Sequence, residues 1–95
     1  MLEKLSAIEE RYEELERLII DPEVVMDYAK VAEYSKERSS LSEIVDSFRL
    51  YRQQLAELED AKQMLIEETD SELSAMAKDE IDALTTSTEK LLEDL

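Results

Sequence analysis

The amino-acid sequence predicts an all-α fold, an antiparallel helical bundle or coiled-coil-like hairpin of three to four helices in one domain over residues 1–95. Apolar residues recur three and four positions apart in three long stretches, which is the period of a helix that buries one face. No stretch alternates apolar and polar residues as a half-buried strand does. The chain has no Gly and one Pro, so tight hairpin turns with left-handed backbone are not expected.

The longest apolar stripe lies in the middle of the chain, and we expect the other segments to pack against it. The stripe consists of Leu41, Ile44, Phe48, Tyr51, Leu55, Leu58, Ala61 and Leu65. A helix over Leu41 to Leu65 is a rod of roughly 37 Å at 1.5 Å per residue. Such a helix cannot bury its stripe alone. We expect it to end near Glu67 or Glu68.

A first helix is predicted before the central one, and it is expected to end near Ile20. Its stripe consists of Leu2, Leu5, Ile8, Tyr12, Leu15 and Leu18 or Ile19. Asp21 and Pro22 then indicate a new helix, because an aspartate caps a helix N-terminus and Pro suits the first position, where an N–H has no partner. A weaker apolar face predicts helix from Val24 to Arg38.

Two interpretations are open for the serines that follow this weaker face. Ser40 and Glu43 have the spacing of a capping box, which indicates a break or kink near Ser40 and a new helix start. One long helix with solvent-facing serines fits the same residues.

The last predicted helix begins after the turn at Thr69. Asp70 is the expected cap, and Glu72 lies in the first turn, where a carboxylate suits the helix dipole. The stripe consists of Leu73, Met76 or Ala77, Ile81, Leu84, Leu91 and Leu95. Because Thr85 to Thr88 are poor helix formers, we expect fraying after Thr85.

The net charge of −15 is unevenly distributed. Residues 1–52 carry 13 acids and 8 bases, giving −5, and residues 53–95 carry 13 acids and 3 bases, giving −10. Phosphate binding needs clustered Lys and Arg, and anionic lipid repels an acidic surface, so neither nucleic acid nor membrane is an expected partner. A partner of the second half is expected to be basic or neutral. No apolar run approaches about 18 residues, and we expect a cytoplasmic location.

Catalytic, cofactor-binding and metal-binding residues are not expected in this chain. It has no His and no Cys, which removes the usual general base, the thiol nucleophile and most transition-metal sites. The serines lack a base to activate them. The densest carboxylate cluster is Glu67, Glu68, Asp70 and Glu72. A calcium loop needs a sharp turn with alternating ligands, so we favour a solvated helix end and cap over a metal site.

Arg49 and Arg52 flank Tyr51, and this group suggests either a small contact for RNA or a partner, or two ordinary helix residues. We favour arginines that pair with nearby acids and lay their stems over the stripe. Two other sets are expected to belong to the core or its edge, not to binding platforms. They are the tyrosines Tyr12, Tyr28, Tyr34 and Tyr51 and the methionines Met26, Met64 and Met76.

Several strings, in order, resemble the N-terminal domain of bacterial peptide chain release factor 1, of the class I release factor family. They are Leu2-Glu3-Lys4-Leu5, Glu9-Glu10-Arg11-Tyr12-Glu13-Glu14-Leu15, Asp21-Pro22-Glu23-Val24, Ser35-Lys36-Glu37-Arg38, Tyr51-Arg52 and Met76-Ala77-Lys78-Asp79-Glu80. The sister factor typically has an aromatic pair after its Asp-Pro, whereas Val24-Val25 stands here. This difference favours release factor 1.

The resemblance implies a cytoplasmic protein of translation termination at the stop codons UAA and UAG. In the family, a later domain reads the codon and another hydrolyses peptidyl-tRNA through a Gly-Gly-Gln motif, and this chain without Gly has neither. The family's N-terminal domain projects near the ribosomal stalk base and engages the GTPase that recycles release factors. The resemblance therefore implies a non-catalytic interaction domain, with the ribosome and that GTPase as partners.

An alternative is an unrelated acidic coiled-coil adaptor or oligomerisation module, since Glu/Leu-rich helices resemble one another. The two hypotheses differ in what lies downstream in the gene. A Gly-Gly-Gln motif there supports the release factor, and its absence supports the adaptor.

Overall fold

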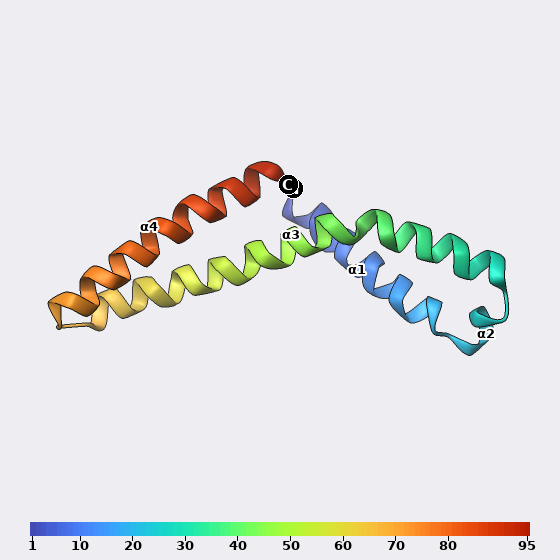
Figure 1. Cartoon of the computed structure of the whole chain (residues 1–95), viewed down its shortest axis with the longest axis horizontal. Helices are drawn as coiled ribbons and strands as arrows, with labels where there is room; N and C mark the ends of the chain where they lie inside the picture. Colours follow the sequence, from blue (N-terminus) through green and yellow to red (C-terminus); the bar gives the residue numbers. More distant parts are fainter. The chain divides into compact units, whose positions relative to one another are not determined.

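The structure, a computed structural model that describes residues 1–95, contains four α-helices and no strand (Figure 1). The helices are α1 (Leu2–Ile19), α2 (Pro22–Val25), α3 (Tyr28–Glu67) and α4 (Ser71–Asp94). The all-α helical prediction is confirmed. No helix is both long enough and apolar enough to cross a membrane.

The chain forms two compact units that divide α3 between them. The N-terminal unit, Met1–Asp46, contains α1, α2 and the first part of α3. The C-terminal unit, Ser47–Leu95, contains the rest of α3 and α4. Each unit is a helical hairpin, so each has a narrow seam of apolar side chains in place of a broad core.

In the N-terminal unit, α1 buries one stripe as expected. Leu5, Tyr12 and Leu15 are buried, and Leu15 is fully inaccessible. Val45 of α3 is also buried, although the expected stripe ran through Ile44, which is only half-buried. The sequence therefore gave the right face of α1, while the start of the central stripe lies one residue away from its expected position.

The connection between α1 and α3 differs from its prediction. Asp21 caps α2 as expected, with its Oδ1 accepting the Glu23 N–H at 2.8 Å. However, α2 ends at Val25 after one turn, so the helix predicted from Val24 to Arg38 is interrupted. A second aspartate explains the interruption, because the Oδ1 of Asp27 accepts the Lys30 N–H at 3.2 Å and caps α3.

The serines after Arg38 do not break α3, which is continuous from Tyr28 to Glu67. Of the two open interpretations, the single long helix is therefore correct. Ser40 does not act as a cap, since its hydroxyl donates to the backbone carbonyl of Glu37 at 2.6 Å. This bond within the helix satisfies the hydroxyl and leaves the helical backbone intact.

The C-terminal unit has a seam in which positions three and four apart alternate on both helices. On α3 the seam consists of Tyr51, Gln54, Leu58, Ala61 and Leu65, and on α4 of Ser74, Ala77, Ile81, Leu84, Thr88, Leu91 and Leu95. This alternation is the pattern of a coiled-coil interface. Leu55, which was expected in the stripe, is 39% exposed, so that prediction was wrong.

A polar contact explains why Gln54 takes the place of Leu55 in the seam. The hydroxyl of Ser87 on α4 donates to the Oε1 of Gln54 on α3. A polar group at a seam position is tolerated when its partner lies across the interface, and such a pair also fixes the register of two helices.

The expected fraying after Thr85 was also wrong, because α4 continues to Asp94. Thr88 is buried, and its hydroxyl donates to the Thr85 carbonyl at 3.1 Å. Tertiary packing therefore outweighs the low helix propensity of these residues. The start of α4 is as predicted, because Asp70 accepts the N–H groups of Glu72 and Leu73 at 2.8 and 3.2 Å.

Candidate interaction surfaces

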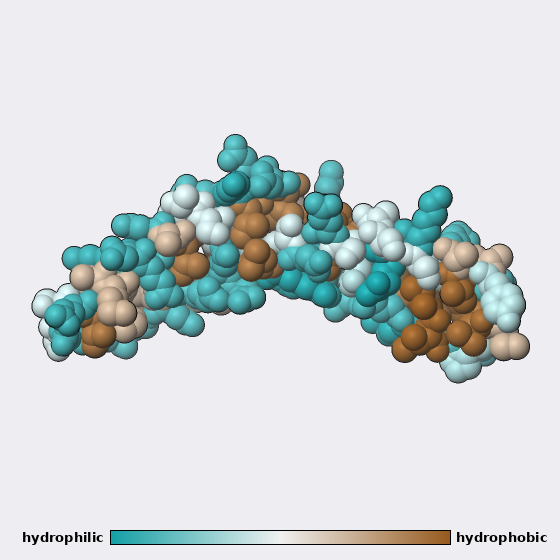
Figure 2. Space-filling view, in the orientation of Figure 1, coloured by the Kyte–Doolittle hydropathy of each residue, from teal (hydrophilic) through white to brown (hydrophobic).

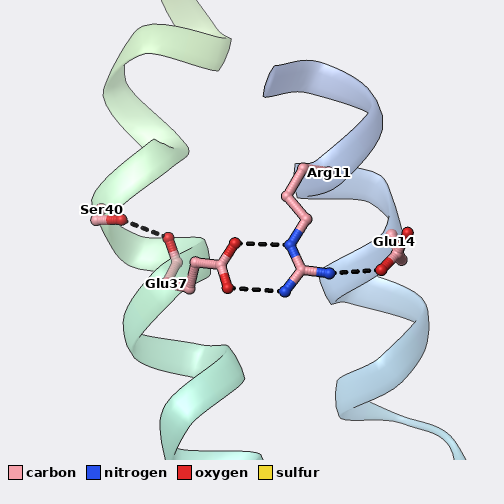
Figure 3. A network of polar contacts seen from close by, with 4 residues as sticks. All are labelled: Arg11, Glu14, Glu37 and Ser40. Carbon is pink, nitrogen blue, oxygen red and sulfur yellow. Dashed lines mark hydrogen bonds and ion pairs between the residues drawn. The ribbon is translucent and has the colours of Figure 1, made fainter. Parts of the chain in front are cut away.

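A network of polar contacts joins α1 to α3 in the N-terminal unit (Figure 3). The guanidinium of Arg11 faces the carboxylate of Glu37, with Nε–Oε2 and Nη2–Oε1 distances of 2.6 and 2.8 Å. The third guanidinium nitrogen of Arg11 donates to Glu14 on its own helix. Two parallel bonds between planar groups fix the relative position of the two helices more closely than one bond could.

The Arg11–Glu37 contact changes the acidity of both groups. Hydrogen bonding from Arg11 lowers the pKa of Glu37 below its ordinary value of 4.5, and the positive charge of Arg11 acts in the same direction. Hydrogen bonding to Glu37 raises the pKa of Arg11 above its ordinary value. The pair therefore stays ionised throughout the neutral range.

Replacing Glu37 by Gln is expected to destabilise the chain at neutral pH and to have no effect in strong acid. The pKa of Glu37 is lower in the folded chain than in the unfolded one. Its contribution is thus fully present above about pH 4.5 and is lost as the pH falls through the folded pKa. Urea midpoints of the native chain and Glu37→Gln, measured from pH 7 to pH 3, are expected to converge in acid.

The matched control for this measurement is Glu59→Gln, which removes one exposed carboxylate from another helix segment. A difference between native and Glu37→Gln midpoints that stays constant across the pH range would contradict the contribution of the ionised pair. Because both side chains are more than a third exposed, solvent screening keeps the neutral-pH effect small.

A second arginine, Arg38, closes the edge of the N-terminal seam. Its guanidinium carbon lies 4.9 Å from the centre of the Tyr12 ring, and its Nη2 donates to the Glu16 carboxylate at 3.0 Å. Arg38 also forms part of an open depression of about 310 Å³. The residues lining this depression are Glu16, Ile19, Ile20, Ser35, Arg38 and Ser39.

Beside this depression, large apolar side chains are exposed where α1, α2 and the start of α3 meet. We call this surface the apolar tip. It consists of Ile20, Val25, Met26 and Tyr28, with exposed fractions of 76%, 45%, 78% and 82%. Figure 2 shows hydrophobic residues gathered at this end of the N-terminal unit, on the right of the view. Met26 and Tyr28 were expected in the core or at its edge, and both predictions were wrong.

The C-terminal unit disposes of the other candidate residues differently. Tyr51 is buried, and the guanidinium carbon of Arg52 lies 4.6 Å from the centre of the Phe48 ring. This arrangement confirms the expected packing of an arginine over the stripe. Met64 and Met76 are exposed at 42% and 65%, so their expected place in the core was wrong.

The four acids at the α3–α4 turn cap helices and do not gather around a common point. Besides the Asp70 cap, the Oε1 of Glu68 accepts the N–H groups of Thr69 and Asp70 at 3.1 and 3.0 Å. The described chain contains no group of three or more His, Cys, Asp or Glu side chains arranged to hold a metal ion.

A family model for the PCRF domain matches residues 8–95, which include α2, α3, α4 and most of α1. The chain belongs to the PCRF domain family. The resemblance to bacterial peptide chain release factor 1, expected from the ordered strings, is confirmed.

Three relatives of this PCRF domain carry the name peptide chain release factor 1. The protein from Bacillus subtilis (strain 168) is 52% identical over 95 residues, covering 100% of this chain and 27% of the relative. Those from Geobacillus sp. (strain WCH70) and Bacillus licheniformis are 47% and 48% identical, again over 100% of this chain and over 26% and 27% of the relatives. The chain thus spans about a quarter of these relatives. No solved structure was found to match it.

Two features of this PCRF domain escaped the sequence reasoning. The Arg11–Glu37 pair joins residues 26 positions apart, and no local pattern marks that distance. The apolar tip could have been recognised from Asp27, because an aspartate before a helix is a cap signal. A cap at that position ends the preceding helix and leaves Met26 in the connection.

Proposed function

We propose that this PCRF domain is the N-terminal interaction domain of a peptide chain release factor that terminates translation at the stop codons UAA and UAG. The observation that carries the proposal is the match over the whole chain to release factor 1 proteins at 47–52% identity. An unrelated coiled-coil adaptor would not be expected to match over its entire length.

In this proposal, residues 1–95 act as a single non-catalytic domain of a cytoplasmic factor. The chain contains no Gly-Gly-Gln motif, no His and no Cys, so these residues offer no evident group to orient water against the peptidyl-tRNA ester. The domain contributes binding, and its partners are the ribosome near the stalk base and the GTPase that recycles release factors. Its net charge of −15 favours protein contacts over direct binding of rRNA.

The purified 95-residue chain is expected to inhibit recycling of the intact factor without releasing peptide itself. Both results follow from a domain that binds the GTPase but lacks the hydrolytic motif. The measurement titrates the chain into a termination reaction that contains stop-codon-programmed ribosomes, intact factor and the recycling GTPase. Peptide release and factor turnover are followed separately.

The control is an equal concentration of the chain carrying Leu15→Ala and Phe48→Ala, which removes two buried side chains and is expected to unfold both units. Release of peptide by the native chain alone would contradict its non-catalytic role. Recycling that is equally fast with the native chain and with the unfolded control would contradict its role in binding the GTPase.

A further inference from the structure

The apolar tip is unusual in the N-terminal unit because its side chains are exposed yet held by an ordered backbone. Asp21 and Asp27 cap α2 and α3 on either side of it. The Asp27 N–H also donates to the Val24 carbonyl at 2.8 Å, which closes the turn between these helices. A surface that is already ordered loses little conformational entropy when a partner binds, so this tip is well suited to docking.

The exposed fractions at the tip argue that a partner covers it in the assembled factor. Met26 and Tyr28 are each more than three-quarters exposed, although Tyr and Met are enriched in the contacts of protein interfaces. Ile20 belongs both to the tip and to the neighbouring depression. The depression therefore extends the apolar surface and offers space beside Ile20 for a side chain of the partner.

The charges around the tip select among possible partners. Residues 20–28 carry three acids, Asp21, Glu23 and Asp27, and no base. Nucleic acid and anionic lipid are repelled by this rim, and so is the same tip of a second copy. A complementary surface has apolar side chains at its centre and Lys or Arg around them.

We propose that the apolar tip docks a basic surface of a protein partner, with an apolar side chain of that partner set against Ile20 and Met26. This inference rests on the proposed function, because it assigns a surface to the interaction domain. The partner is identified by its chemistry, a protein with an apolar centre and a cationic rim. The recycling GTPase and the large ribosomal subunit are the two probes.

The test uses a double variant at the tip and a matched double variant in the C-terminal unit. Ile20→Ser with Met26→Ser removes two exposed apolar side chains from the tip. Ile66→Ser with Met76→Ser makes the same chemical changes at residues that are 77% and 65% exposed. Binding of each 95-residue chain to the purified GTPase and to purified large subunits is measured by titration, with circular dichroism to verify folding.

The tip variant is expected to bind at least one probe about ten-fold or more weakly than the native chain, because central apolar contacts carry most of the energy of an interface. The control variant is expected to bind as the native chain does. If the native chain binds but the two variants weaken binding equally, the tip assignment is wrong and the proposed function stands. If the native chain binds neither probe, the proposed function fails and the assignment fails with it.

Charge and self-association provide two independent readouts. Glu23→Lys is expected to slow association several-fold at low salt, with a smaller effect at high salt, whereas Glu59→Lys is expected to have less effect. Equal slowing by both would mean that net charge, and not the tip, attracts the partner. Sedimentation that shows a dimer of the native chain, abolished only by the tip variant, would make a second copy the occupant and overturn the basic-partner proposal.

Discussion

Replacing Phe48 by Ala is expected to lower the free energy of unfolding by about 3–5 kcal/mol. Phe48 is 3% exposed, and the Arg52 guanidinium lies over its ring. Truncation removes the buried ring, leaves a cavity and takes away the surface on which Arg52 rests. Small domains have total stabilities of about 5–15 kcal/mol, so this one change is expected to remove a large part of the total.

The matched comparison is Leu55→Ala, one further turn or two along the same helix. Leu55 is 39% exposed and lies outside the seam, so its truncation is expected to cost about 1 kcal/mol or less. Urea unfolding followed by circular dichroism measures both variants against the native chain. Equal losses for Phe48→Ala and Leu55→Ala would contradict the seam that contains Gln54 and restore the stripe expected from the sequence.

The sequence predicted the helices well because periodicity and capping are local properties. Asp21 and Asp70 each lie where an aspartate is expected at a helix start, and both act as caps. The buried face of α1 follows from apolar residues at helical spacing. These features depend on residues a few positions apart, so the sequence contains all the information that they need.

The seam of α3 could not be placed from its own residues alone. Apolar spacing favours Leu55, but the buried neighbours Tyr51 and Leu58 place the seam at Gln54, one residue earlier. The deciding contact is the hydrogen bond from Ser87, which lies 33 residues away on α4. Thr88 illustrates the same limit, because its burial against the hairpin outweighs a local preference against helix.

The apolar tip shows how exposure escapes a reading based on hydrophobicity. Met26 and Tyr28 have the residue types and spacing of core positions, and the sequence alone assigns them there. Their exposure follows from the end of α2 at Val25 and from the cap at Asp27. The candidate binding surface therefore emerged only when the backbone between α1 and α3 was known.

Removing residues 1–95 from the intact factor is expected to leave most stop-codon-dependent release in place and to slow recycling about ten-fold or more, the loss of about 1.4 kcal/mol of interaction free energy. In the proposed function, codon reading and hydrolysis belong to other domains, and this PCRF domain contributes contacts with the GTPase. The two activities are therefore expected to separate. A general folding defect would instead reduce release and recycling together.

The most direct measurement is the rate at which the recycling GTPase turns over the intact factor, the truncated factor and an intact factor carrying Ile20→Ser and Met26→Ser. Single-turnover peptide release is recorded on the same preparations. We expect release within a few-fold of the intact rate in all three, with recycling slowed in the truncated factor and in the tip variant. A truncated factor that is recycled as fast as the intact one would contradict the role of this PCRF domain in binding the GTPase.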